Sequence, residues 1–133
     1  MNIVVAMDSF KGSLSSLEAG NGVKEGILKA MPEANVSVYP LADGGEGTVE
    51  ALVLGLNGKL EKVMVTGPLG EPVECTYGIL EATGTAVIEM AGAAGITLVP
   101  EKERNPLNTT TYGVGEVIKD AIRKGCRHFI VGI

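Results

Sequence analysis

Apolar runs alternate with amphipathic stretches in the first part of the chain. Residues 3–7 form a continuous apolar run, typical of a strand buried on both faces of a parallel sheet. The stretch between Ser15 and Pro32 has apolar residues at helical spacing. A second apolar run, residues 36–39, precedes a shorter helical stretch over residues 48–56. This order of strand, helix, strand and helix predicts an α/β fold with a parallel sheet.

The first helix has a clear start signal. Ser15 and Glu18 stand three residues apart, which is the spacing of a capping box. One face of the helix then carries four small or apolar residues, and these are Ala19, Val23, Ile27 and Ala30. Proline at position 32 ends the helix.

The middle of the chain has the pattern of antiparallel hairpins. Residues 59–66, 73–80 and 86–90 are short strand-like runs. Turn-forming residues at 67–70 and 82–85 separate them. We therefore expect a meander here, and we place a domain boundary near the start of the first of these turns.

The last third of the chain returns to alternating helix and strand. Residues 91–95 are small enough for one helical turn, and residues 112–124 have apolar positions at helical spacing, followed by Gly125. Residues 129–131 indicate another buried strand. The chain ends at Ile133, where an open α/β sheet would begin a ligand-binding loop. We therefore expect these residues to be an N-terminal piece of a longer protein.

Composition narrows the classes of function. The chain has 133 residues with 45% hydrophobic residues, enough for one globular domain with a core. Its net charge of -5 and few aromatic residues argue against a nucleic-acid partner. No apolar stretch approaches the ~18 residues of a membrane span, and the start does not resemble a signal peptide. Cys75 and Cys126 are far apart in sequence, which favours a reduced, cytoplasmic setting.

The segment over residues 43–48 is the strongest candidate for chemistry. It has the sequence Asp-Gly-Gly-Glu-Gly-Thr and follows the second predicted strand. Its glycines allow a tight turn with exposed N–H groups, which suits an anion or phosphate, while Asp43 and Glu46 suit a metal ion or a polyhydroxylated substrate. The alternative is a simple helix start with Asp43 as cap and Glu46 as its capping partner. Both interpretations can hold at once.

A second group of polar residues follows the first predicted strand. Asp8, Ser9 and Lys11 precede the first helix. Lys11 suits a phosphate or carboxylate, and Asp8 suits a hydroxyl or a metal ion. The alternative is a polar loop that caps the helix. If the two strands are neighbours, Asp8, Lys11, Asp43 and Glu46 meet at one edge of the sheet.

Weaker candidates lie further along the chain. Residues 108–116 enter the long helix with hydroxyls and free N–H groups that suit an anion, although the residues alone slightly favour simple capping. Glu89 ends a predicted strand beside a turn of small residues. His128 and Cys126 have the pattern of structural residues.

Three motifs, residues 7–15, 41–48 and 110–116, together resemble the bacterial glycerate kinase family. The resemblance implies an enzyme that uses ATP and Mg²⁺ to phosphorylate D-glycerate, commonly to 2-phosphoglycerate. It also implies two α/β domains with the active site in the cleft between them. Residues 1–66 would be the N-terminal part of a doubly wound, Rossmann- or flavodoxin-like domain. Residues 67–133 would begin an inserted second α/β domain with antiparallel hairpins.

The resemblance also implies roles for single residues. Lys11 would neutralise phosphate or the glycerate carboxylate, and Asp8 and Asp43 would position glycerate hydroxyls or Mg²⁺. The expected substrate-binding residues are Ser9, Gly44, Gly45, Glu46, Thr110, Thr111 and Gly113.

Members of that family are longer and continue past the last strand into an active-site loop rich in glycine, serine and aspartate. We therefore expect this chain to be inactive alone, because phosphoryl transfer needs nucleotide, metal and acceptor held together. The alternative function is a non-catalytic module that binds a small carboxylate or phosphate.

Overall fold

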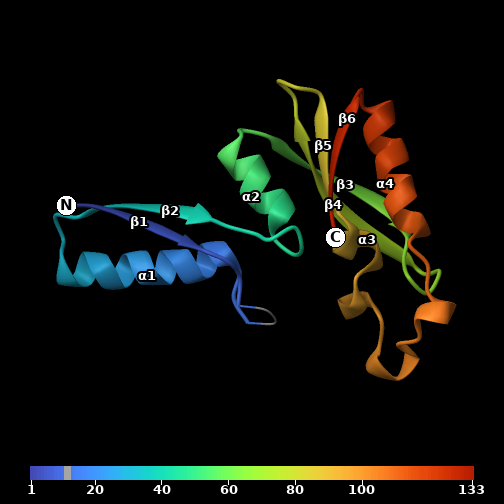
Figure 1. Cartoon of the computed structure of the whole chain (residues 1–133), viewed down its shortest axis with the longest axis horizontal. Coiled ribbons are helices and arrows are strands. Elements are labelled where there is room, and N and C mark those ends of the chain that lie inside the picture. Colours follow the sequence, from blue (N-terminus) through green and yellow to red (C-terminus); the bar gives the residue numbers. More distant parts are fainter. Residues whose placement is uncertain (11–12) are drawn as a thin grey trace.

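The computed structural model describes residues 1–10 and 13–133, and it contains two β-sheets (Figure 1). In the first sheet, β1 (Asn2–Met7) and β2 (Asn35–Pro40) pair in parallel, with Met7 opposite Pro40. Helix α1 (Ser16–Ala30) packs along this sheet. The expected strand–helix–strand unit and its parallel pairing are therefore confirmed.

Helix α1 begins as the sequence predicts. The Ser15 hydroxyl accepts a hydrogen bond from the Glu18 N–H at 3.2 Å, and the Glu18 carboxylate accepts one from the Ser15 N–H at 2.8 Å. The helix lies close to the sheet at Gly20, where a Cβ atom would fall 2.5 Å from a methyl group of Val38. Glycine at this position therefore allows the close approach of α1 to β2.

The described residues cover one of the two faces of the first sheet. Val5 is buried, but its neighbour Val4 is 66% exposed. In α1, Ala19 is buried whereas Val23 is 41% exposed. The expectation that residues 3–7 are buried on both faces is therefore wrong for this chain, because a single helix can cover only one face of two strands.

The second sheet has four strands in the order β3-β4-β5-β6. Its strands are β3 (Lys59–Thr66), β4 (Pro72–Leu80), β5 (Thr85–Glu89) and β6 (His128–Gly132). The first three pair antiparallel, and β6 joins β5 in parallel. The hairpins predicted from the sequence are thus present, and the last strand completes a mixed sheet.

The two sheets separate before β3, not at Gly67. Strands β3 and β4 pair along their whole length, from Lys59 opposite Ile79 to Thr66 opposite Pro72. Residues 67–70 are therefore the turn of a hairpin, with Gly70 at a φ of 93°. The expected boundary between residues 66 and 67 would cut this hairpin. The chain passes from one sheet to the other in the glycine-rich segment between β2 and α2 (Thr48–Gly55).

Helices cover both faces of the second sheet (Figure 1). Helix α2 packs on one face through Val49 and Val53, against Leu80 and Val87. Helices α3 (Met90–Ala94) and α4 (Tyr112–Arg123) pack on the other face. The core there includes Val65, Cys75, Tyr77, Ile79, Ile88, Val117 and Ala121. Alternate residues of each strand thus face alternate sides, as the pleat of a sheet requires.

Three single-turn helices connect α3 to α4. They are η1 (Ile96–Leu98), η2 (Glu101–Glu103) and η3 (Pro106–Asn108). Across residues 1–10 and 13–133, no helix has the length and apolar character needed to cross a membrane.

Candidate active site

The loops after β1 and β2 leave the same edge of the first sheet. This follows from the parallel pairing, and the Leu41 N–H donates a hydrogen bond to the Met7 carbonyl at 3.0 Å where both strands end. The expected juxtaposition of the two loops is therefore confirmed. Lys11 lies outside the described residues, so its expected place beside Asp43 stays a prediction.

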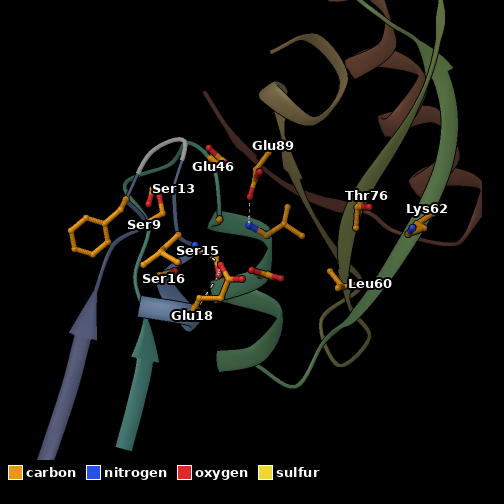
Figure 2. A pocket seen from close by; sticks show the side chains of 15 residues that line it. Ser9, Ser13, Ser15, Ser16, Glu18, Glu46, Leu60, Lys62, Thr76 and Glu89 are labelled. Atoms are coloured by element: carbon orange, nitrogen blue, oxygen red, sulfur yellow. Dashed lines mark hydrogen bonds between the residues drawn. The ribbon is translucent and has the colours of Figure 1, made fainter. Parts of the chain in front are cut away.

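A cavity of about 640 Å³ lies between these loops and the second sheet (Figure 2). The loop after β1 and the start of α1 contribute serine hydroxyls, which are those of Ser9, Ser13, Ser15 and Ser16. The start of α2 contributes Glu46 and Glu50, and the second sheet contributes Leu60, Lys62, Thr76 and Glu89. Hydroxyl and carboxylate groups from three parts of the chain thus line the cavity, together with apolar side chains such as Phe10 and Val49.

The glycine-rich segment turns sharply before α2. Gly44 and Gly47 have φ angles of 111° and 90°, in the left-handed region that favours glycine. The Asp43 carboxylate accepts a hydrogen bond from the Gly45 N–H at 3.1 Å. Gly44 also packs against Gly132 at the end of β6, where a Cβ atom would collide with the Gly44 carbonyl. Two glycines thus bring the segment into contact with the second sheet.

Glu89, and not a residue of the segment itself, caps α2. The N-cap residue is Gly47, and it has no side chain to cap the helix. The Glu89 carboxylate reaches across from the end of β5 and accepts a hydrogen bond from the Val49 N–H at 2.6 Å. The interpretation of Asp43 and Glu46 as the caps of this helix is therefore wrong. The anion that occupies this helix start is a carboxylate of the same chain.

The surroundings of Glu89 oppose its charge. Burial raises the pKa of this carboxyl group, and the negative charges of Glu46 and Glu50 raise it further. Hydrogen bonds from the N–H groups of Val49 and Gly47 act in the opposite direction and lower the pKa. The pKa of Glu89 is raised overall, and the N–H groups of the helix start offset part of this rise.

The charge along the described cavity wall is negative. Lys62 is the one basic residue among its lining residues, and its ammonium group pairs with Glu74 at 2.7 Å. Four acidic residues line the cavity, and they are Glu18, Glu46, Glu50 and Glu89. The carboxylate of Glu18 already accepts hydrogen bonds from Ser15. A negatively charged ligand in this cavity therefore needs a positive charge that the described lining residues do not supply.

The third motif does not reach this cavity. The Thr110 N–H donates to the Pro68 carbonyl at 3.0 Å, and its hydroxyl accepts a hydrogen bond from the Tyr112 N–H at 3.1 Å. Gly113 packs against the Thr66 carbonyl. Thr111 lines a separate groove of about 490 Å³ between β3 and α4. The start of α4 is thus occupied by contacts with the β3–β4 hairpin.

The structure brings together only part of the predicted site. Ser9 and Glu46 line the cavity, whereas Asp8 and Asp43 lie in the bordering loops, with Asp8 accepting a hydrogen bond from the Ser9 N–H at 2.7 Å. Gly44 and Gly45 lie in the same bordering segment.

Sequence reasoning missed Lys62 and Thr76, which lie opposite each other in β3 and β4. The alternation of side chains along the two strands predicts that both residues lie on the same face of the sheet. It does not predict that this face borders a cavity.

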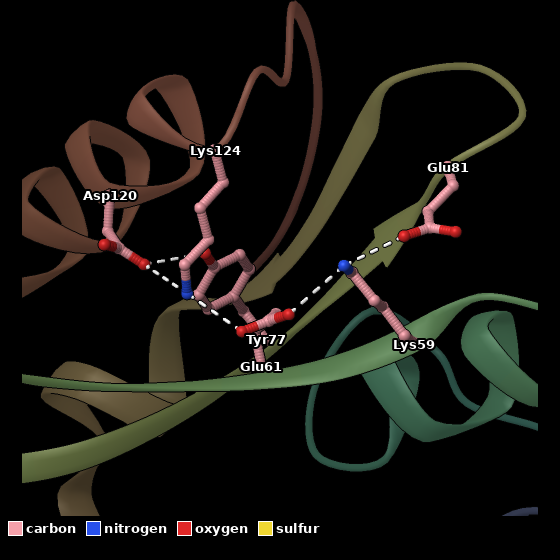
Figure 3. Close-up of polar contacts among 6 residues, drawn as sticks. All are labelled: Lys59, Glu61, Tyr77, Glu81, Asp120 and Lys124. Atoms are coloured by element: carbon pink, nitrogen blue, oxygen red, sulfur yellow. Dashed lines mark hydrogen bonds and ion pairs between the residues drawn. The ribbon is translucent and has the colours of Figure 1, made fainter.

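A second polar cluster lies on the opposite face of the sheet and is structural (Figure 3). Tyr77 is completely buried, and its hydroxyl donates to Asp120 at 2.7 Å. The Lys124 ammonium group lies 3.0 Å from Asp120 and 2.9 Å from Glu61. Burial raises the pKa of Tyr77 to about 12, with a further contribution from Asp120. These contacts join α4 to β3 and β4.

Comparisons with known proteins agree with the motifs. A model of the glycerate kinase family matches residues 3–133. Glycerate kinase from Bacillus subtilis strain 168 is 50% identical over 133 residues, and glycerate 2-kinase from Escherichia coli K12 is 46% identical over the same length. Each match covers 100% of this chain and 35% of the relative, so the chain spans about a third of the length of these relatives.

A solved structure gives the same result. A crystal structure from Salmonella typhimurium LT2, provisionally assigned as glycerate kinase 2, superimposes with a TM-score of 0.80 at 47% identity. The match covers 100% of this chain and 36% of that one. The α/β fold expected from the sequence is therefore confirmed.

Proposed function

The chain belongs to the glycerate kinase family, and we propose that the whole protein transfers a phosphoryl group from ATP to a hydroxyl of D-glycerate. The observation that carries this proposal is the 50% identity to a named glycerate kinase, which extends over all 133 residues. The motif-based resemblance is confirmed by the same match. Because the chain spans about a third of the length of that relative, the activity is proposed for the whole protein.

The cavity of about 640 Å³ is a suitable place for a small hydroxy acid. Hydroxyls of Ser9 and Ser13 and the carboxylate of Glu46 offer hydrogen-bonding partners for the hydroxyls of glycerate. In the transfer, a glycerate oxygen bonds to the γ-phosphorus of ATP, the bond from that phosphorus to the β,γ-bridging oxygen breaks, ADP leaves with this oxygen, and the hydroxyl proton passes to solvent. Positioning of the acceptor is the principal contribution of such a site.

Within this proposal, Lys11 neutralises the glycerate carboxylate or a phosphate, and Asp8 and Asp43 orient the acceptor. The negative cavity wall supports a need for the Lys11 ammonium group, since Lys62 is the one basic residue among the described lining residues. We propose 2-phosphoglycerate as the product, in line with the name of the Escherichia coli relative.

We propose Mg²⁺ as the ion that accompanies ATP. The described residues contain no group of three or more His, Cys, Asp or Glu side chains that could hold a metal ion. Magnesium often binds through one or two carboxylates together with the substrate phosphates. We therefore assign none of the described residues to the ion.

The test is an assay of ADP release by the full-length protein with D-glycerate, ATP and MgCl₂. We expect sustained ADP release with D-glycerate and little with L-glycerate. Phosphorus NMR of the product distinguishes 2-phosphoglycerate from 3-phosphoglycerate. Absence of D-glycerate-dependent ADP release from a folded protein would contradict the proposed activity.

Replacing Asp43 tests the glycine-rich segment. We expect Asp43→Asn in the full-length protein to lower kcat/KM for D-glycerate about 100-fold, since the substitution removes a charge that orients the acceptor. A matched control is Glu33→Gln, at an exposed acid in the turn between α1 and β2, which we expect to stay within twofold of the wild type. Equal activity of the two variants would remove Asp43 from the site.

A further inference from the structure

We propose that Glu89 is a positioning residue for this reaction, because its carboxylate holds the start of α2 and the glycine-rich segment at the cavity wall. The inference rests on the proposed function, and it assigns a role to a residue outside the three sequence motifs. Glu89 itself acts through the backbone that it binds.

The contact joins two parts of the molecule that are distant in sequence. Glu89 is the last residue of β5, and it accepts the Val49 N–H across a separation of 40 residues. Gly47 has no side chain that could take over this bond. The start of α2 therefore depends on a group from the second sheet for its hydrogen bonding.

The carboxylate occupies an unfavourable place for a charge. It is partly buried, and the acids Glu46 and Glu50 lie near it on the same helix start. Among the described residues, the N–H groups of Gly47 and Val49 offset part of this cost. Replacing Glu89 by an apolar residue would relieve the repulsion between the acids but leave these N–H groups without their partner.

The position of Glu46 follows from this contact. Glu46 lines the cavity together with Ser9 and Ser13, and it directly precedes Gly47 in the chain (Figure 2). A shift of the helix start would move Glu46 and the adjoining glycines relative to Ser9. Small displacements of binding groups have large effects on the capture of a small acceptor.

The experiment compares three substitutions in the full-length protein. We expect Glu89→Ala to raise the KM for D-glycerate about tenfold while the KM for ATP stays within twofold. Glu89→Gln keeps an oxygen at the same reach, so we expect its KM for D-glycerate within about threefold of the wild type. Glu89→Asp keeps the charge but is one methylene shorter, and we expect it to behave like Glu89→Ala. Glu33→Gln again serves as the matched control.

Two kinetic outcomes would overturn the proposal. An unchanged KM for D-glycerate in folded Glu89→Ala, with only kcat and Tm reduced, would show a purely structural role. A loss in Glu89→Gln as large as in Glu89→Ala would show that the charge, and not the held backbone, matters. If Glu89→Ala does not fold, Glu89→Gln is compared with Glu89→Asp. A KM for D-glycerate that is no higher in Glu89→Asp than in Glu89→Gln would then overturn the proposal.

Hydrogen exchange separates this inference from the proposed function. We expect the amides of residues 44–49 to exchange faster in Glu89→Asp than in Glu89→Gln, whichever substrate the protein uses. Failure of the wild type to phosphorylate D-glycerate would overturn the function, while equal exchange in the two variants would overturn the positioning role.

Discussion

Tyr77 illustrates how one buried side chain can link elements. Its ring is completely buried in the core, while its hydroxyl donates to Asp120. Lys124 lies 5.4 Å from the centre of the ring and also pairs with Asp120. The hydrogen bond to Asp120 therefore exists only while the phenol keeps its proton.

This environment predicts a loss of stability at alkaline pH. The pKa of Tyr77 is raised from 10.0 to about 12, so the folded state retains the proton longer than the unfolded state. The resulting stabilisation is fully present below pH 10 and is lost as the pH rises through 12. We expect the Tm of the wild type to fall more between pH 10 and 12 than that of Tyr77→Phe. At pH 8 the variant should be less stable by about 1 kcal/mol.

Tyr39→Phe is the matched control, because Tyr39 is 56% exposed. Thermal unfolding followed by circular dichroism at several pH values measures the effect. Parallel pH dependence in the wild type and Tyr77→Phe would show that the phenol does not contribute to the alkaline loss.

Single residues of the site were predictable only where they stand in a motif. Ser9 and Glu46 follow predicted strands, and both line the cavity. Glu89 appeared only as a weak candidate, since an acid at a strand end gives no sign of the helix that it will cap. Its partner is Val49, and that pairing depends on how α2 packs on the second sheet. Sequence spacing does not contain this information.

At the scale of elements, the start of α4 is bound tightly to β3. The Glu116 carboxylate accepts a hydrogen bond from the Thr66 N–H at 2.6 Å. One turn earlier, Gly113 packs against the Thr66 carbonyl and is buried. Gly115, in the same helix, has open space where a Cβ atom would lie. A side chain at position 113 would therefore collide with β3, whereas position 115 has room for one.

We expect Gly113→Ala to destabilise the whole protein by about 2 kcal/mol, because the new methyl group would collide with backbone that cannot easily move. Gly115→Ala should stabilise it by about 0.5–1 kcal/mol, since alanine favours the helix and meets nothing there. Urea unfolding of both variants measures the difference. Similar free energies of unfolding for the two would contradict the close packing of α4 on β3.

The elements themselves were largely predictable, but their grouping was not. Periodicity located the strands and helices, because each buries one face or both. It could not show that residues 59–66 belong to the second sheet, since a glycine- and proline-containing turn has the same composition as a domain linker. The full pairing of β3 with β4 decides this point.

At the scale of the whole molecule, one face of the two-stranded first sheet is exposed among the described residues. Val4 and Tyr39 lie on β1 and β2 and are more than half exposed. Parallel strands in α/β proteins are usually covered on both faces. The relatives are long enough to provide this cover, because the chain spans only 35% of their length.

We therefore expect the 133-residue chain alone to show no sustained ADP release with D-glycerate, ATP and Mg²⁺. Phosphoryl transfer requires donor and acceptor to be held together, and the chain spans about a third of the length of the relatives that it matches. The coupled assay run beside the full-length protein measures this. Steady turnover by the short chain would contradict the expectation.

The glycine-rich segment has two roles in the architecture. It is the covalent bridge from β2 to α2, and it also borders the cavity, with Gly44 resting on Gly132. Any rotation of one sheet against the other therefore changes the backbone conformation of the segment that borders the cavity. Binding in the cavity and the angle between the two sheets are thus thermodynamically linked. A ligand that binds better to one conformation of the glycine-rich segment also favours one orientation of the two sheets.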